Sequence, residues 1–172
     1  MSMEKYNKIH FIGIGGISMS SLAEILKSKG KTITGSDGVA SNVTKALENI
    51  GIQVSIGQKA ENITPDTDLI VYTAAVKEDN PELMAARASG IETVDRAALV
   101  GMMMLEYKFP LSVAGTHGKT TTSSLVTEIF LEANTNPTVS IGGILPSIKG
   151  NYKVGGEDYF ILETCEYCDS FL

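Results

Sequence analysis

The chain has 172 residues, of which 43% are hydrophobic and 20% charged, and this composition excludes disordered, fibrous and disulfide-stapled proteins. The formal net charge is −6, so no basic field could dominate binding to nucleic acid, and anionic ligands must be held locally by loops. No apolar run approaches the roughly 20 residues of a membrane span and the first residues lack a signal-peptide pattern, so we expect a cytoplasmic protein that does not bind a membrane.

Strand and helix patterns alternate over residues 1–107. An apolar run over residues 9–14 predicts a buried strand, a glycine cluster follows it, and helical spacing extends over residues 19–28. The later elements are predicted as strand 32–35, helix 44–49, strand 52–56, strand 69–72, a helix from the start signal Asn80-Pro81-Glu82 to Gly90, strand 91–94 and helix 96–105. This alternation predicts a Rossmann-like α/β domain over residues 1–107 with a doubly wound parallel sheet.

A second α/β unit is predicted to begin at residue 108. A strand over residues 111–114 leads into another glycine-rich turn and a helix over residues 119–133, and further strands are predicted over residues 138–141 and 159–162. A unit of roughly 60 residues buries little core by itself. We therefore interpret residues 108–172 as the incomplete start of a second domain, and we expect the chain to be part of a longer protein.

The first glycine loop has the sequence Gly13-Ile14-Gly15-Gly16-Ile17-Ser18. Such glycines allow a tight turn in which backbone N–H groups approach a diphosphate at the positive end of a helix. Compared with the dinucleotide pattern G-x-G-x-x-G, the third glycine is replaced by Ser18, whereas Asp37 stands 22 residues after Gly15, the usual distance of a ribose contact. By itself the loop leaves open an NAD site, another diphosphate ligand, or a turn that merely joins strand to helix.

The second glycine loop lies between an apolar strand and a helix, which is the setting of a phosphate-binding loop, or P-loop. Backbone N–H groups and the helix dipole would hold phosphate oxygens, Lys119 would neutralise β and γ phosphate charge, and the Thr120 hydroxyl would bind Mg²⁺. Only two residues separate Gly115 from Gly118, where the general motif has four. The loop that we predict to bind phosphates has the sequence Gly115-Thr116-His117-Gly118-Lys119-Thr120-Thr121.

Acidic residues follow the last predicted strand, at Glu163, Glu166 and Asp169. A carboxylate at the carboxyl end of a strand can face the phosphate loop and share its metal ion, so Glu163 is predicted to bind Mg²⁺ together with Thr120. Cys165 and Cys168 have the spacing of a redox motif or of half a zinc site, but no second pair of cysteine or histidine residues completes a zinc set. We expect both thiols to be reduced and without a role.

Five segments together resemble the Mur ligase family over essentially the whole chain. They are HFIGIGGISMSSLAEIL, GSD, NPE after a strand, AGTHGKTTT and ETCEYCDSFL, and their order and spacing agree with the family. The glycine loops are most similar to those of the alanine-adding members. Many relatives have an aspartate at the position of Cys165, so one negative charge is missing here.

The resemblance implies two nucleotide sites. ATP would bind at residues 115–121, and Lys119, Thr120 and Glu163 would be the catalytic residues, with Thr120 and Glu163 on Mg²⁺. The first domain would bind UDP in place of NAD, with residues 15–18 and Thr73 near the phosphates and Asp37 near the uridine. The residues expected at the UDP-sugar site are Gly15, Gly16, Ile17, Ser18, Asp37 and Thr73.

The resemblance also implies a reaction. Family chemistry would phosphorylate the lactyl carboxylate of UDP-N-acetylmuramate with ATP and let the amine of L-alanine attack the acyl phosphate. Further central residues and a carboxyl-terminal domain would lie beyond Leu172, so we expect this chain to bind substrate without ligating it. Two alternatives remain: an NAD-dependent oxidoreductase or sensor, and a UDP-sugar-binding module without catalysis.

Overall fold

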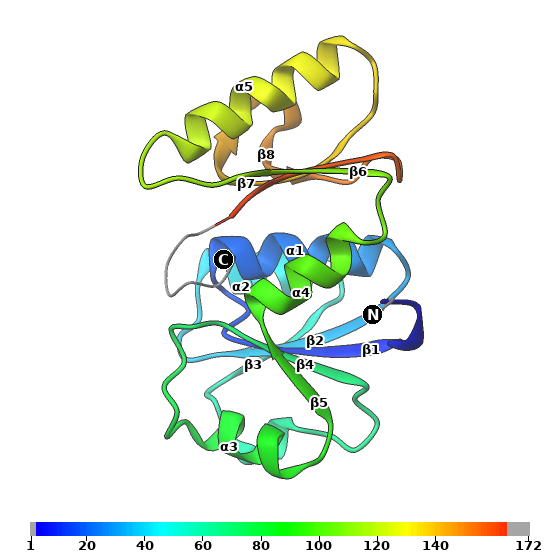
Figure 1. Ribbon diagram of the computed structural model, residues 1–172. Coiled ribbons are helices and arrows are strands. Elements are labelled where there is room, and N and C mark those ends of the chain that lie inside the picture. The colour runs from blue at the N-terminus through cyan, green and yellow to red at the C-terminus, as the bar shows by residue number, and fades with distance from the viewer. Residues whose placement is uncertain (1–2, 165–172) are drawn as a thin grey trace. The chain divides into compact units, whose positions relative to one another are not determined.

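The computed structural model describes residues 3–164, and within them the chain forms two compact units (Figure 1). The first comprises Glu4–Leu99, and the second runs from Val100 onward and includes Met3. The division between the units therefore falls inside helix α4 (Arg96–Met104).

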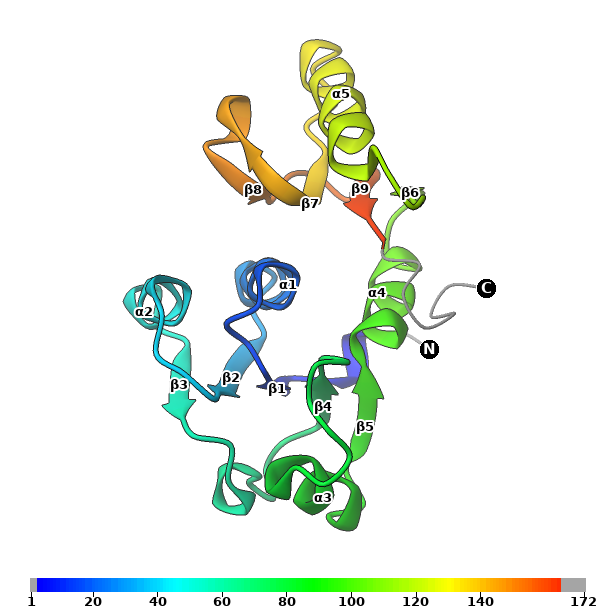
Figure 2. The ribbon, with the colours of Figure 1, turned by 90° about the vertical axis from the view of Figure 1, so that its left-hand side faces the viewer.

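The first unit is built on a five-stranded parallel sheet with the order β3-β2-β1-β4-β5. Helices α1 and α2 lie on one face of this sheet and α3 on the other (Figures 1 and 2). The predicted doubly wound α/β fold is therefore confirmed. The elements are β1 (Lys8–Ile12), α1 (Ile17–Ser28), β2 (Thr32–Asp37), α2 (Asn42–Asn49), β3 (Gln53–Ile56), β4 (Leu69–Tyr72), α3 (Pro81–Ala88) and β5 (Glu92–Asp95), with short 3-10 helices η1 (Met3–Lys5) and η2 (Ala60–Asn62).

The strand order creates a switch point between β1 and β4. The chain passes from β1 to β2 and β3 on one side of the sheet, and then returns to place β4 and β5 on the other side of β1. Loops that leave the carboxyl ends of the two central strands therefore diverge, and a crevice forms between them. The first glycine loop follows β1, and Thr73 follows β4, so both lie at this crevice.

The core of the first unit consists of apolar side chains on both faces of its central strands. Ile12 and Ile70 pack with Leu83 and Ala86 of α3, and all four are fully buried. His10 is a buried polar residue within β1, with 3% of its surface exposed. A central strand buried on both faces explains why β1 has a continuous apolar sequence rather than an alternating one.

Two helix starts illustrate how local sequence sets the element boundaries. Asn80 caps α3 by accepting hydrogen bonds from the N–H groups of Glu82 and Leu83, and Pro81 occupies the first turn, as the start signal predicts. Helix α2 begins earlier than the helical spacing suggested, because Ser41 and Thr44 form a capping box. None of the helices within residues 3–164 has the length and apolar character to cross a membrane.

The second unit has a four-stranded sheet with the order β6-β9-β7-β8, in which only β8 runs antiparallel to its neighbour. Apolar residues of α5, including Val126 and Phe130, pack on β7 and β9. Pro110 is tolerated within β6 because that strand is at the sheet edge. The elements are β6 (Phe109–Val113), α5 (Lys119–Glu132), β7 (Thr138–Leu145), η3 (Pro146–Ile148), β8 (Gly150–Lys153) and β9 (Tyr159–Glu163).

Gly35→Ala should destabilise the first unit. A Cβ atom at this position would lie 2.7 Å from Ile14 Cδ1 and 2.8 Å from the Phe11 carbonyl oxygen, so we expect the free energy of unfolding to fall by about 1–3 kcal/mol through overpacking. Gly38→Ala is the matched control, since no described heavy atom lies within 4 Å of its Cβ position. Urea unfolding followed by circular dichroism measures the difference, and equal stability of the two variants would contradict the prediction.

Candidate functional site

A cavity of about 720 Å³ opens at the carboxyl end of the first sheet. It lies at the switch point, because its lining comes from the loops that follow β1, β2, β3 and β4. Open α/β sheets bind their ligands at this place. The lining residues are Gly13, Gly16, Asp37, Gln58, Thr73, Ala75, Val76, Lys77, Asp79, Asn80 and Pro81.

The first glycine loop is attached to the end of β2. The N–H groups of Gly13 and Ile14 both donate to the carbonyl oxygen of Ser36, at 2.9 Å each. Gly13 has a φ of +83°, and a Cβ atom there would lie 2.6 Å from Thr73 Cγ2. A side chain at position 13 would therefore be strained and would displace Thr73 from the cavity wall.

Asp37 holds the next turn of the same loop. Its Oδ2 atom accepts a hydrogen bond of 2.8 Å from the Gly15 N–H, and its Oδ1 atom accepts one of 3.2 Å from the Val39 N–H. A Cβ atom on Gly15 would come within 2.7 Å of the same carboxylate. Asp37, which we predicted to contact a ribose or uridine, therefore also positions the glycine loop, and it lines the cavity.

The remaining predicted residues of this site lie at the start of α1. Gly16 caps the helix without a side-chain hydrogen bond, and Ile17 is 57% exposed. Ser18 Oγ accepts a hydrogen bond of 3.1 Å from Arg96 Nη1. An arginine therefore adds positive charge beside the amino end of α1, where the helix dipole already favours an anion.

Sequence reasoning missed the cavity-lining Lys77 and Asp79 and three further polar residues of this site. Gln58 and Asn80 line the cavity, and the Asn80 side-chain amide donates to Gln58 Oε1 at 2.7 Å. Arg96 directly follows β5, at the same edge of the sheet as the other loops. The general rule that parallel strands present their carboxyl ends at one edge could have identified all three.

The second glycine loop has the backbone of a turn that leads into a helix. Gly115 and Gly118 have φ values of +147° and +76°, and Gly118 is the N-cap of α5. Lys119 is the first residue of α5, and its ammonium group donates to the Gly115 carbonyl at 2.6 Å. The lysine charge is therefore held over the loop, while Thr116 and His117 are exposed.

Glu163 meets this loop from the end of β9. Its two carboxylate oxygens accept hydrogen bonds of 3.0 and 2.9 Å from the Thr120 hydroxyl. The N–H of Gly142 donates to the same carboxylate at 2.9 Å, and the Ser123 hydroxyl lies 3.4 Å away. Thr120 and Glu163, which we predicted as a pair from positions far apart in the sequence, are direct neighbours.

Two glycines in β7 make this approach possible. A Cβ atom on Gly142 would lie 2.9 Å from both Glu163 carboxylate oxygens, and one on Gly143 would lie 2.8 Å from Thr120 Cγ2. Glycine inside a strand often marks a place where another group approaches closely. That signal was present in the sequence, although the predicted strand ended at residue 141, before both glycines, whereas β7 continues to Leu145.

The Thr120 and Glu163 oxygens suit a shared Mg²⁺ ion. Adjacent oxygens of an octahedral Mg²⁺ site with bonds of roughly 2.0–2.1 Å are about 2.9 Å apart, which matches the separations of 3.0 and 2.9 Å. Within residues 3–164, no three histidine, cysteine or acidic side chains gather as a metal cage, and Mg²⁺ commonly needs only one carboxylate beside phosphates and water. Glu166, Asp169, Cys165 and Cys168 lie outside the described residues.

Comparison with known proteins identifies the family. The family model described as "Mur ligase family, catalytic domain" matches residues 8–108, which is more than half of the chain. The chain belongs to the Mur ligase family. The resemblance seen in the glycine loops and the NPE segment is thereby confirmed.

Two relatives place the chain within this family. It is 59% identical over 164 residues to a UDP-N-acetylmuramate–L-alanine ligase of Agathobacter rectalis, covering 95% of this chain and 36% of the relative. A UDP-N-acetylmuramate–L-alanine ligase of Caldanaerobacter subterraneus is 51% identical over 172 residues, with coverage of 100% and 37%. The chain thus spans about a third of the length of the curated Mur ligases that it matches.

Solved structures give the same family but do not separate its branches by fold. The crystal structure of a UDP-N-acetylmuramate-alanine ligase from Thermotoga maritima matches with a TM-score of 0.84 and 37% identity, covering 92% of this chain and 37% of that one. A murein peptide ligase from Psychrobacter arcticus matches with a TM-score of 0.83 and 28% identity, covering 93% and 38%. The two backbones are therefore equally similar, whereas the sequence is closer to the alanine ligase.

Proposed function

We propose that this chain is the UDP-sugar-binding domain, residues 1–107, and the start of the ATP-binding domain, residues 108–172, of a ligase that joins L-alanine to UDP-N-acetylmuramate. The observation that carries the proposal is the second loop, where Lys119, Thr120 and Glu163 gather as ATP and Mg²⁺ require. The identity of 59% to a protein named for this reaction supports the choice of substrates. The rest of the central domain and the carboxyl-terminal domain of such a ligase would be its partners.

The UDP moiety would bind in the cavity of the first unit. Its diphosphate would lie against Gly15, Gly16, Ile17 and Ser18 at the amino end of α1, where N–H groups and the helix dipole attract an anion. Thr73 would line the phosphate side, and Asp37 would face the uridine; both line the cavity. Arg96, beside Ser18, and Lys77 in the cavity lining would contribute positive charge near the diphosphate.

ATP would bind at the second loop, along Gly115, Thr116, His117, Gly118 and the first turn of α5. Lys119 would exchange its contact with the Gly115 carbonyl for the β and γ phosphates, and Thr121 would add a polar group to the same turn. Thr120 and Glu163 would hold Mg²⁺, which neutralises developing phosphate charge when bound. None of these residues needs to act as a covalent nucleophile.

The proposed reaction activates a carboxylate that is otherwise a poor electrophile. The lactyl carboxylate oxygen would attack the γ-phosphorus of ATP, the bond to the β-phosphate oxygen would break, and ADP would leave. The amine of L-alanine would then attack the acyl carbon, lose a proton and expel phosphate as the amide forms. Positioning and charge neutralisation account for most of the catalysis in such transfers.

Two other functions explain less of the structure. An NAD-dependent oxidoreductase or sensor would use the first glycine loop and Asp37, but it gives no role to the arrangement of Lys119, Thr120 and Glu163. A UDP-sugar-binding module without catalysis would use the first unit alone. The oxidoreductase and the binding module each predict nucleotide binding that differs from that of the proposed ligase.

Calorimetric titration with UDP-N-acetylmuramate tests the first site. We expect a saturable heat with this ligand, because the switch-point cavity is formed entirely by residues of the first unit. With the two control ligands, we expect weaker binding of UDP-N-acetylglucosamine and no heat with NADH. Binding of NADH alone would overturn the proposed function and leave only the fold. Binding of the sugar nucleotide by a chain that never binds ATP would favour the binding module.

The ATP site is tested by Lys119→Ala and Glu163→Gln, with Lys108→Ala as the control for loss of one positive charge in the same unit. Lys119→Ala should weaken ATP binding by about 10- to 100-fold, because a charge-assisted contact to phosphate is lost. Glu163→Gln should weaken binding only when Mg²⁺ is present. Equilibrium binding of a fluorescent ATP analogue, with Mg²⁺ or with EDTA, measures both effects; identical affinities for the Lys119 and Lys108 variants would argue against an ATP site here.

We expect the 172-residue chain alone not to ligate, since it spans about a third of the length of its relatives. Phosphate release would be followed with ATP, Mg²⁺, UDP-N-acetylmuramate and L-alanine, and a full-length relative would serve as the positive control. Sustained turnover by the short chain would refute this expectation. Nucleotide binding without turnover is the expected result.

A further inference from the structure

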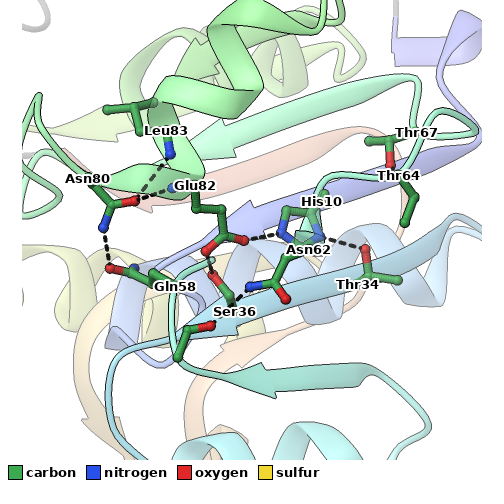
Figure 3. A network of polar contacts seen from close by, with 11 residues as sticks. His10, Thr34, Ser36, Gln58, Asn62, Thr64, Thr67, Asn80, Glu82 and Leu83 are labelled. Carbon is green, nitrogen blue, oxygen red and sulfur yellow. Dashed lines mark hydrogen bonds and ion pairs between the residues drawn. The ribbon is translucent and has the colours of Figure 1, made fainter. Parts of the chain in front are cut away.

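A buried carboxylate lies beneath the cavity of the first unit. Glu82, in the first turn of α3, has no exposed surface. Its Oε1 atom lies 2.8 Å from His10 Nε2, and its Oε2 atom accepts a hydrogen bond of 2.6 Å from the Ser36 hydroxyl. Figure 3 shows the carboxylate reaching from α3 to these two side chains on the sheet.

The histidine that contacts this carboxylate has a second partner on β2. His10 and Thr34 are neighbours in the register of β1 and β2, and His10 Nδ1 lies 2.8 Å from Thr34 Oγ1. Both ring nitrogens of His10 are therefore engaged, one by Thr34 and one by Glu82. Glu82 Oε1 lies at the imidazole, while Glu82 Oε2 accepts from Ser36.

Ser36 connects the carboxylate to the first glycine loop. While its hydroxyl donates to Glu82, its carbonyl oxygen accepts from the N–H groups of Gly13 and Ile14. The next residue, Asp37, accepts from the Gly15 N–H. A shift of Ser36 would therefore move every backbone N–H group by which β2 holds the loop.

Helix α3 connects the same carboxylate to a second part of the cavity lining. Asn80, which caps the helix two residues before Glu82, accepts from the Glu82 N–H at 3.0 Å and orients the Gln58 amide. Asn80 and Gln58 both line the cavity. Glu82 thus joins two walls that come from different parts of the sequence.

Packing alone does not explain this residue. An apolar side chain of similar volume could fill the space between α3 and the sheet, and a buried charge is costly unless it is fully paired. The polar network instead fixes one distance and one orientation between α3 and the end of β2. Resting on the proposed binding of a UDP-sugar in this cavity, we propose that Glu82 is a positioning residue that sets the glycine loop through Ser36 and so determines the affinity for the diphosphate.

The test uses Glu82→Leu, Glu82→Gln and Ser36→Ala, with Thr34→Val as the matched control. Thr34 lies on the same face of β2 and its hydroxyl contacts the same histidine, whereas the loop N–H groups bond to Ser36 and Asp37. Amide hydrogen exchange of Gly13 and Ile14 is measured first, without ligand, against amides of β7 and β9 in the second unit. UDP-N-acetylmuramate affinity is then measured by calorimetry.

We expect Glu82→Leu and Ser36→Ala to raise loop exchange and to weaken affinity by about tenfold, which is the scale of one lost hydrogen bond to a charged group. Glu82→Gln keeps an acceptor for Ser36 and should stay within about threefold of the natural chain on the same scale. Thr34→Val and the second-unit amides should be unchanged. If Glu82→Leu does not fold, Ser36→Ala decides.

The positioning role is overturned if loop exchange in Ser36→Ala equals that in Thr34→Val, or if the exchange of both units rises together. Failure of the proposed function is a different result. A natural chain that does not bind UDP-N-acetylmuramate would refute the ligand, while the loop exchange of the four variants would still decide whether Glu82 and Ser36 set the loop.

Discussion

The hydrogen bonds between the end of β2 and the first glycine loop are the contacts on which the first site depends. The loop must turn sharply out of β1 and start α1 within four residues, and glycine alone gives the chain too many conformations to do so reproducibly. The carbonyl of Ser36 and the carboxylate of Asp37 accept the N–H groups of Gly13, Ile14 and Gly15 and select one conformation. The shape of the cavity follows from that selection.

The second site also has a carboxylate at the end of a strand that contacts the start of a helix. Glu163, at the end of β9, accepts from the Thr120 hydroxyl at the start of α5, and Gly142 both donates to it and leaves room for it. In each unit a carboxylate at the end of a strand approaches a helix start, and glycine permits the approach. The carboxylates differ in consequence: Asp37 holds backbone N–H groups, whereas Glu163 holds a side-chain hydroxyl with which it could share a cation.

Both sites address the same electrostatic difficulty. With a net charge of −6, the chain repels anions at long range, and its own acidic groups stand near both loops. Attraction must therefore be local, through helix amino ends and single cations at short distance. Arg96 beside Ser18 and Lys119 over Gly115 are such cations. Their closeness to the loops matters more than the total charge of the chain.

The sequence revealed the features that rest on local patterns. The order of strands and helices, the cap at Asn80 and the two glycine loops follow from periodicity and from residues adjacent in the chain. Strand β8 was missed because its residues are half-buried and form no apolar run. The pairing of His10 with Glu82 was also missed, because a histidine inside an apolar strand and an acid in a first turn become partners only when α3 packs on the sheet.

The limits of fold similarity show where specificity must lie. The alanine ligase and the murein peptide ligase match this chain with TM-scores of 0.84 and 0.83, so this chain's backbone is equally similar to both. A shared backbone places glycine loops and strand ends alike, and it therefore accounts for what the two proteins have in common. Their different amino-acid or peptide substrates must be selected by side chains, or by parts of those proteins that this chain does not match. The identity of this chain to the alanine ligase, 37%, exceeds its 28% identity to the murein peptide ligase, so sequence separates the two relatives where the fold does not.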